Sequence, residues 1–329
     1  MKFWIFSSFF LWVDERFYGD IMKAESKTEG KDLMRIGGDI NCYHGLYTLE
    51  ETVDIMAEAG FTAIDFSFME RGQYDASSME PEMQQKFRDL RKYAEDRGLC
   101  FAQAHAINLE VSDNPEETAE SFRDVLRCMH NAAVLGAKII VVHPLQHLDY
   151  TEEGNPEKLF EMNVEFYNRL IPYCKEYKIK VALENMCQGK YFPIGSKTRF
   201  VDSSCSTPEE FSRYLDTINS EWIVGCFDIG HCMLTHQRPE DFIRKIGGKR
   251  IQAIHVHDGD GDTDLHTLPY IGGMANWDHI TKALKDVGFA GTFNFEAGNF
   301  LKPLPKELYP IGAKMIAETG KYLVSKIIG

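Results

Sequence analysis

The amino-acid sequence predicts a single-domain α/β fold, a closed (β/α)8 barrel of the TIM type. Eight short apolar or β-branched runs alternate with segments of helical period, which is typical of parallel strands joined by right-handed helical crossovers. The length of 329 residues suits one such barrel. No G-x-G-x-x-G motif opens a helix after the first predicted strand, and this disfavours the rival fold, a doubly wound open sheet.

The eight predicted strands and three helix boundaries follow from local patterns. We expect strands at residues 35–42, 62–68, 100–105, 138–143, 180–184, 223–228, 251–257 and 292–296. Thr48 and Glu51 have capping-box spacing at the start of a helix that ends at Gly60. Thr207 before Pro208 predicts another helix start, and a later helix is expected to end at Gly288.

Two segments depart from the strand–helix alternation. Residues 187–206, after the fifth strand, are rich in Gly, Ser and basic residues, and an insert of this length is usually a functional lid or a flexible element. Residues 1–33 hold a short apolar stretch that is too short to span a bilayer and lacks the small-residue cleavage site of a signal peptide. We therefore expect a non-core extension at 1–33 and the barrel at 34–329.

Composition limits the class of partner. The chain has 50 acidic and 36 basic residues and a formal net charge of −14, which argues against nucleic acid or an anionic membrane as the main partner. Its eight cysteines form no C-x-x-C motif, which favours the reducing cytoplasm. The sequence leaves the oligomeric state open, with a homo-oligomer or a heteromeric partner subunit both possible.

Most predicted strands end in a side chain that can bind a metal ion. Chemistry in this fold sits where the strands end, and six of the eight ends are His105, His143, Glu184, Asp228, His257 and Glu296. Carboxylates that converge in a desolvated mouth repel one another unless a cation neutralises them. The sequence therefore predicts a bound divalent metal.

The last four strands supply the predicted ligands Glu184, Asp228, His257 and Glu296. Three carboxylates and one imidazole favour an octahedral ion, with Mn²⁺ preferred and Co²⁺ or Mg²⁺ as alternatives. Zn²⁺ stays open.

Five short motifs give the chain a resemblance to a known family. They are LEN at 183–185, DIGH at 228–231, HVHD at 255–258, DLHTLPYIGGMANW at 264–277 and FNFE at 293–296. Over about residues 34–300 the chain resembles the sugar phosphate isomerase/epimerase family of the xylose-isomerase-like barrel superfamily, in particular its ketose 3-epimerases, and more distantly the apurinic endonucleases. The resemblance implies the same four metal ligands, with Glu184 and Glu296 as the acid/base pair. They would abstract a proton next to a sugar carbonyl, through an enediolate.

Four further histidines are candidate substrate-binding residues: His105, His143, His231 and His266. In the isomerases that the chain resembles, His105 and His143 would line the sugar pocket. Each could instead have a structural role, with His231 supporting Asp228 and His266 organising its loop.

The sequence departs from the epimerase pattern after the seventh strand, where Gly-Asp-Gly-Asp-Thr-Asp replaces an expected arginine. Asp264-Leu265-His266 resembles the D-x-H of the endonuclease branch. With His105, His143 and His231 it gives nearly the full ligand set of that branch's trinuclear zinc site.

The leading functional hypothesis is a metal-dependent isomerase or epimerase of a small sugar or cyclitol. A lyase of the same superfamily, such as a keto-inositol dehydratase or a C-glycoside deglycosidase subunit, begins with the same proton abstraction. A trinuclear-zinc nuclease and a non-catalytic sugar-binding protein are further alternatives. No arginine cluster supports a phosphorylated substrate, although Lys190, Lys197 and Arg199 in the insert could supply charge.

Overall fold

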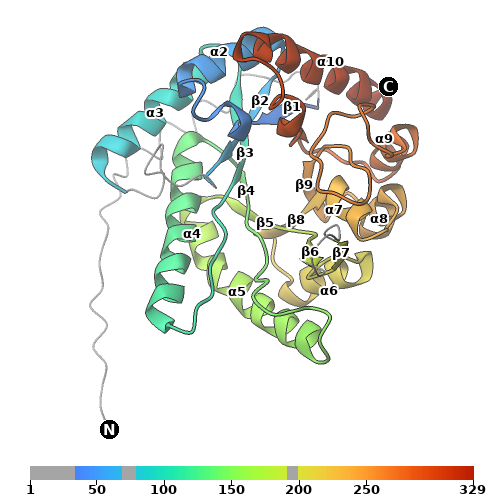
Figure 1. Ribbon diagram of the computed structural model, residues 1–329. Coiled ribbons are helices and arrows are strands. Elements are labelled where there is room, and N and C mark those ends of the chain that lie inside the picture. The colour runs from blue at the N-terminus through green and yellow to red at the C-terminus, as the bar shows by residue number, and fades with distance from the viewer. Residues whose placement is uncertain (1–33, 69–78, 191–198) are drawn as a thin grey trace. The chain divides into compact units, whose positions relative to one another are not determined.

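The computed structural model describes residues 34–68, 79–190 and 199–329 and shows a ring of parallel strands enclosed by helices (Figure 1). The predicted barrel is therefore confirmed. Its eight-stranded sheet has the order β10-β1-β2-β3-β4-β5-β8-β9. The strands are β1 Ile36–Asp39, β2 Ala63–Ser67, β3 Cys100–His105, β4 Ile139–Val141, β5 Lys180–Glu184, β8 Ile223–Asp228, β9 Ile251–His255 and β10 Phe293–Phe295.

The barrel closes between β9 and β10 through a single parallel bridge, Val256 to Phe295. The Val256 amide donates to the Asn294 carbonyl at 2.8 Å, and the Glu296 amide donates to the Val256 carbonyl at 3.1 Å. Closure thus fixes the backbone next to the candidate site residue Glu296.

All eight strands lie where the alternation predicts them, although several are shorter. The fourth ends at Val141, two residues before His143, and the seventh ends at His255, two residues before His257. Beyond His255 the chain turns into an antiparallel bridge between Asp258 and Thr267, which ends the regular strand.

The capping signals in the sequence mark real helix ends. Helix α2, Leu49–Ala59, begins with the predicted capping box, since Thr48 Oγ1 accepts from the Glu51 amide at 3.1 Å and Glu51 Oε2 accepts from the Thr48 amide at 2.8 Å. Helix α6, Pro208–Ile218, is capped by Thr207, and α9, Trp277–Asp286, ends shortly before Gly288. The remaining helices are α3 Pro81–Glu95, α4 Pro115–Leu135, α5 Asn155–Tyr177, α7 Ile229–Leu234, α8 Pro239–Ile246 and α10 Tyr309–Ile328, with 3₁₀-helices at Asn41–Tyr43, Gly298–Phe300 and Lys306–Leu308.

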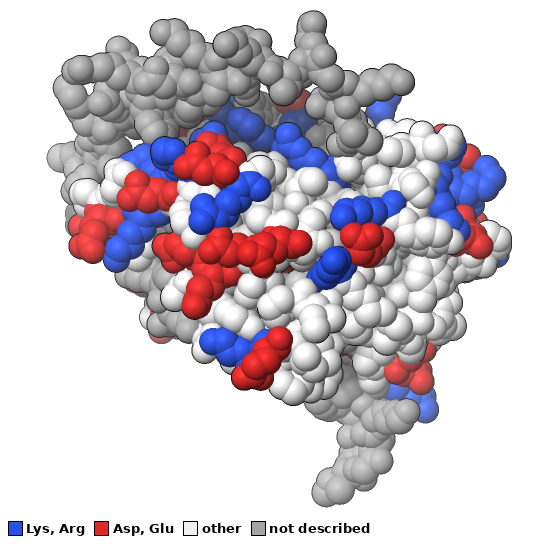
Figure 2. Space-filling model, turned by 90° about the horizontal axis from the view of Figure 1, so that it is seen from above, with Lys and Arg blue, Asp and Glu red and all other residues white. Residues whose placement is uncertain are grey.

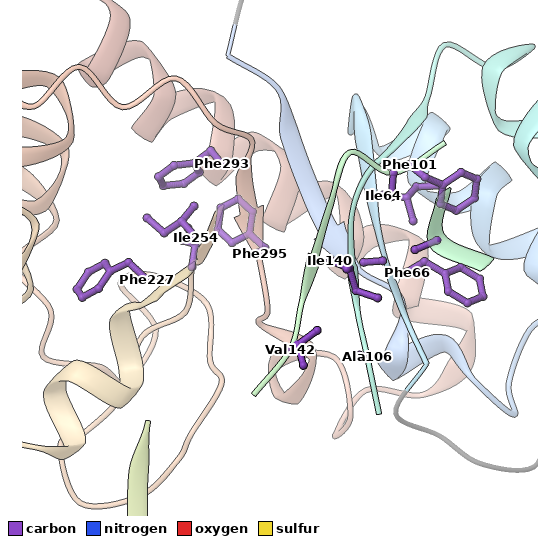
Figure 3. Packing of buried hydrophobic residues seen from close by; sticks show 14 of the residues in the cluster. Ile64, Phe66, Phe101, Ala106, Ile140, Val142, Phe227, Ile254, Phe293 and Phe295 are labelled. Carbon is purple, nitrogen blue, oxygen red and sulfur yellow. The ribbon is translucent and has the colours of Figure 1, made fainter. Parts of the chain in front are cut away.

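Side chains at alternate positions of the strands belong to two different hydrophobic cores. Side chains that point outward, such as Phe66, Phe227 and Ile254, join the large core shared with the helices (Figure 3). Small side chains fill the barrel interior, in a cluster of Val141, Ala182, Val224, Cys226 and Ala253. Because side chains alternate between the faces of a strand, Glu184, Asp228 and His255, each two positions after one of these small residues, also face the barrel axis.

The insert after β5 contains an antiparallel hairpin of β6, Cys187–Lys190, and β7, Arg199–Asp202. Three hydrogen bonds tie this region to the loop that follows β4, one of them from Lys190 to Thr151. Gln146 Nε2 donates to Ser203 Oγ at 2.9 Å, and the Tyr150 amide donates to Gln188 Oε1 at 3.0 Å. The described part of the insert is therefore anchored to the barrel rather than free, and Lys197 lies outside the described residues.

The extension expected at residues 1–33 also lies outside the described residues, so this boundary stays a prediction. Within 34–68, 79–190 and 199–329, no helix is long and apolar enough to cross a membrane.

Candidate active site

Four buried or half-buried side chains meet at the carboxyl ends of β5, β8, β9 and β10. Ligand atoms of Glu184, Asp228, His255 and Glu296 all lie within 4.8 Å of one another. His255 Nδ1 is 2.9 Å from Glu184 Oε1, 3.2 Å from Glu296 Oε2 and 3.6 Å from Asp228 Oδ2. The strand register causes this meeting, because Asp228 of β8 pairs directly with His255 of β9.

This group has the chemistry of a cation site. Within the described residues, Glu184 Oε2 and His255 Nε2 are buried without a hydrogen-bond partner. Three carboxylates buried this closely repel one another, and a divalent cation removes that cost. The donor set therefore fits a divalent ion with three oxygen ligands and one nitrogen.

The charges of the acids and the imidazoles stabilise each other. Burial opposes ionisation of Glu184, but His255 and its neighbours hold the pKa of that carboxyl well below its usual range. Burial likewise opposes ionisation of Asp228, whose pKa His231 and His257 hold well below the usual value. Both carboxylates are thus anionic at neutral pH.

His257 lies beside this group rather than in it. Its Nε2 is 3.0 and 3.1 Å from the two Asp228 carboxylate oxygens, and its ring stacks on His266 with centroids 4.1 Å apart. A Cβ on Gly230 would overlap the His257 ring, so only glycine leaves room for the imidazole there. The structure favours His255 as the nitrogen donor of the four-residue group, while the assignment of His257 as a ligand stays a prediction.

His105 and His143 meet on the other side of Glu184. Their Nε2 atoms are 3.1 Å apart, and His143 Nε2 approaches Glu184 Oε2 to 3.1 Å outside hydrogen-bonding geometry. Burial opposes protonation of both imidazoles. Glu184 outweighs burial at His105, whose pKa is raised, but not at His143, whose pKa is lowered. Ligand atoms of His105, Glu184 and His255 form a second compact group.

A third group joins His231, Asp264 and His266, with ligand atoms within 4.8 Å of one another. His231 Nδ1 donates to the Asn185 carbonyl at 3.0 Å, which leaves Nε2 toward Asp264 at 3.9 Å. His266 Nδ1 donates to the Glu296 carbonyl, and its Nε2 lies 3.0 Å from Asp264 Oδ1. Although burial opposes the charge, Asp264 and Glu296 raise the pKa of His266 to about 10.

Asp258, which follows His257, organises the loop that carries this third group. Its buried carboxylate accepts from the Trp277 indole at 2.7 Å and from the Ala275 amide at 3.0 Å. A Cβ on Gly273 would overlap that carboxylate. The HVHD motif therefore combines one residue of the four-residue group with a loop anchor.

The sequence reasoning missed two carboxylates, Asp39 at the end of β1 and Asp65 in the middle of β2. Burial, with Glu296 and Asp65 nearby, raises the pKa of Asp39 to about 8. Asp65 Oδ2 accepts from Gln103 Nε2 and from Asn294 Nδ2, each at 2.7 Å, and lies 3.9 Å from His255 Nε2. Strand alternation in the first two strands could have found both.

Comparison with known proteins defines the family. The model of the xylose isomerase-like TIM barrel family matches residues 53–319. The chain belongs to this family. Among curated relatives, the uncharacterized protein y4fM of Sinorhizobium fredii is 25% identical over 281 residues, covering 75% of this chain and 80% of the relative. A probable endonuclease 4 of Shouchella clausii is 27% identical over 224 residues, covering 58% of this chain and 68% of the relative.

Solved structures share the fold at low identity. A zinc-bound IolI protein superposes with a TM-score of 0.69 at 18% identity, covering 90% of this chain and 100% of that one. A D-psicose 3-epimerase crystallised with D-fructose gives a TM-score of 0.66 at 14% identity, covering 88% and 99%. At this identity the likeness establishes the barrel and not the activity.

Proposed function

We propose that the protein is a divalent-metal-dependent isomerase or epimerase of a small sugar or cyclitol. The observation that carries this proposal is a pair of glutamates, Glu184 at the end of β5 and Glu296 after β10, whose carboxylates both approach Nδ1 of His255, at 2.9 and 3.2 Å. The epimerases among the solved structures support it as relatives in fold.

The free state of all eight cysteines supports a cytoplasmic location.

The proposed ligands are Glu184, Asp228, His255 and Glu296, with His257 as the sequence-based alternative to His255. Mn²⁺ is the proposed ion, and Co²⁺, Mg²⁺ and Zn²⁺ are alternatives. The ion would polarise the substrate carbonyl and so acidify the neighbouring C–H.

The two glutamates would move the proton between them. The Glu296 side chain is 18% exposed and the Glu184 side chain 1%, so Glu296 is the one open to a substrate from the barrel mouth. Glu184 contacts His255 and adjoins His143, whose side chain is 18% exposed and could carry a proton to or from it. His105, His231 and His266 would hold substrate oxygens.

The test is proton exchange in D₂O. Metal-loaded protein is incubated with a panel of keto-sugars and an inosose, and products are followed by proton NMR. We expect deuterium at the carbon next to the carbonyl, together with inversion or carbonyl migration. Loss of water or of an aglycone would instead indicate the lyase alternative. A panel that shows neither exchange nor conversion would overturn the proposal.

A second candidate function is a hydrolase with a trinuclear zinc centre, as in the apurinic endonucleases. Two further groups of potential ligands adjoin the four-residue group. The group of His105, Glu184 and His255 shares Glu184 with it. In the group of His231, Asp264 and His266, His266 donates a hydrogen bond to the Glu296 carbonyl. The probable endonuclease 4 relatives favour the same possibility. Against it, the net charge is −14, and on the face shown in Figure 2 small groups of basic side chains alternate with acidic ones.

Metal stoichiometry and a DNA substrate separate the two functions. A nuclease should bind about three zinc ions per chain and cleave a duplex with an abasic site, whereas an isomerase needs one ion and leaves that duplex intact.

A further inference from the structure

A cavity lies next to the candidate active site. Its volume is about 610 Å³, within the range of small-molecule sites. It is bounded by the turn between α7 and α8, by the first turns of α8 and α9, and by the loop after β9. None of the four proposed metal ligands lines it.

Polar side chains at the starts of α8 and α9 line one side of this cavity. Arg238 Nη2 and Nε donate to Glu240 Oε1 at 2.6 and 3.1 Å, and His279 Nδ1 lies 3.5 Å from the same oxygen. The Glu240 side chain is only 7% exposed, whereas Arg238 and His279 are 66% and 57% exposed. Glu240 thus holds two exposed nitrogen-bearing side chains, those of Arg238 and His279, at the cavity edge.

The charge of the lining disfavours anionic ligands. Three carboxylates, from Glu240, Asp260 and Asp262, face one guanidinium, that of Arg238. A phosphate or carboxylate ligand would meet net repulsion in such a site. The amides of Gln237 and Asn276 add neutral donors and acceptors, which suit hydroxyl groups.

Two methionines supply an apolar surface in the same cavity. Met233 is buried on α7, while Met274 is 68% exposed at the rim, where its sulfur packs over Gly261. A thioether adapts its shape to an apolar surface. Carboxylates, amides and cationic donors around such a surface match a sugar ring, which has hydroxyls at its edge and C–H groups on its faces.

The loop after β9 is a shared wall of the cavity and the active site. Asp262 lines the cavity, and Asp264, two residues later, belongs to the group with His231 and His266. Two residues span at most about 7 Å of chain. A ligand that extends beyond one sugar ring could therefore occupy both places.

We propose that this cavity binds an uncharged sugar unit. Resting on the proposed function, that unit is the part of the substrate remote from the reacting carbonyl, so the preferred substrates are glycosides rather than free monosaccharides. The Arg238–Glu240–His279 wall positions the hydroxyls, and Met274 covers one face of the ring.

Titration calorimetry on the full chain tests the cavity without any turnover. The probes are cellobiose, maltose, glucose, glucose 6-phosphate and spermidine, each added to protein kept in chelator. We expect a neutral disaccharide to bind more tightly than the monosaccharide, the sugar phosphate or the polyamine. His279→Ala and Met274→Ala should each weaken that binding by about tenfold or more, while Lys282→Ala, on the exposed side of α9, should leave it unchanged.

Glu296→Gln separates this inference from the proposed function. In the Glu296→Gln background we expect Met274→Ala to weaken disaccharide binding by the same factor as in the wild-type background, because Glu296 lies outside the cavity. Sugar binding without any deuterium exchange would retain the cavity and reject the isomerase. The cavity proposal is overturned if neither disaccharide binds, if spermidine or the phosphate is preferred, or if binding survives both cavity variants.

Discussion

Glu184 and Glu296 have the same functional group but different surroundings. Glu184 is surrounded by four imidazoles, whereas the Glu296 side chain at the barrel mouth is partly exposed. A substrate that enters from the mouth meets Glu296 first, so the two acids have unequal tasks in a proton transfer.

Replacing either glutamate by glutamine should reduce turnover while keeping an oxygen for the metal. We expect a fall of roughly 10²- to 10⁴-fold, the usual contribution of a positioned acid or base. Glu296→Gln should also abolish deuterium exchange, whereas Glu184→Gln should retain exchange without completing conversion. The measurement is proton NMR in D₂O. Near-normal turnover of Glu296→Gln with metal bound would reject the two-carboxylate mechanism.

His255 and His257 can be distinguished by metal affinity. His255→Ala should remove most of the bound ion, since Nδ1 lies within 3.6 Å of three carboxylates. His257→Asn keeps a donor for Asp228 and should weaken binding by about tenfold or less. Competition with a chromophoric chelator measures both. The reverse order of affinities would make His257 the ligand.

The difference between these two histidines shows how far sequence reasoning reaches at this scale. The sequence predicts a cation site at the strand end of residues 255–258, and in the structure Glu184, Asp228 and Glu296 lie close together with His255. Both histidines face the barrel axis by alternation, so the choice between them depends on register. Register is set by pairing with β8, which the sequence of β9 alone does not reveal.

At the scale of elements, local signals were sufficient for the helices and insufficient for the insert. The capping box at Thr48 acts within four residues, and it marks the true start of α2. The hairpin of β6 and β7 depends instead on contacts with the loop after β4, such as that between Tyr150 and Gln188. Such contacts between distant segments have no local sequence pattern.

Glu210 on α6 links these segments and gives the fold a pH dependence. Its Oε2 accepts from the Tyr150 hydroxyl at 2.9 Å and from the Cys205 amide at 3.0 Å. Burial raises the pKa of Glu210 from 4.5 to about 7. Because the folded-state pKa is the higher one, the stabilisation is complete below pH 4.5 and is lost as the pH rises through 7.

Glu210→Gln should therefore flatten the dependence of unfolding free energy on pH between 5 and 8. We expect a difference on the order of 2 kcal/mol across this window, measured by urea unfolding. Glu161→Gln, on the exposed face of α5, should follow the wild-type curve. Parallel curves for wild type and Glu210→Gln would contradict the role given to Glu210.

At the scale of the whole molecule, all the strands that pair to close the barrel lie within residues 34–329. β1 pairs with both β2 and β10, and the bridge from Val256 to Phe295 completes the ring. Each strand of the barrel therefore has its neighbours inside this range. The alternation of eight strands and helices predicted this architecture because each unit carries its own apolar period.

Deleting residues 1–33 should leave the barrel folded and its activity unchanged. Circular dichroism and thermal unfolding of the shortened chain would measure this, with the full chain as the control. A loss of cooperative unfolding would show that the segment belongs to the barrel.

The central claim, a divalent cation held by Glu184, Asp228, His255 and Glu296, is tested most directly by elemental analysis. Protein is stripped with chelator, reloaded with Mn²⁺ and dialysed, alongside Asp228→Asn, which loses one anionic ligand without loss of volume. The account predicts at least one ion per wild-type chain and a clear loss of it in Asp228→Asn. A wild-type protein that retains no divalent ion under these conditions would contradict it.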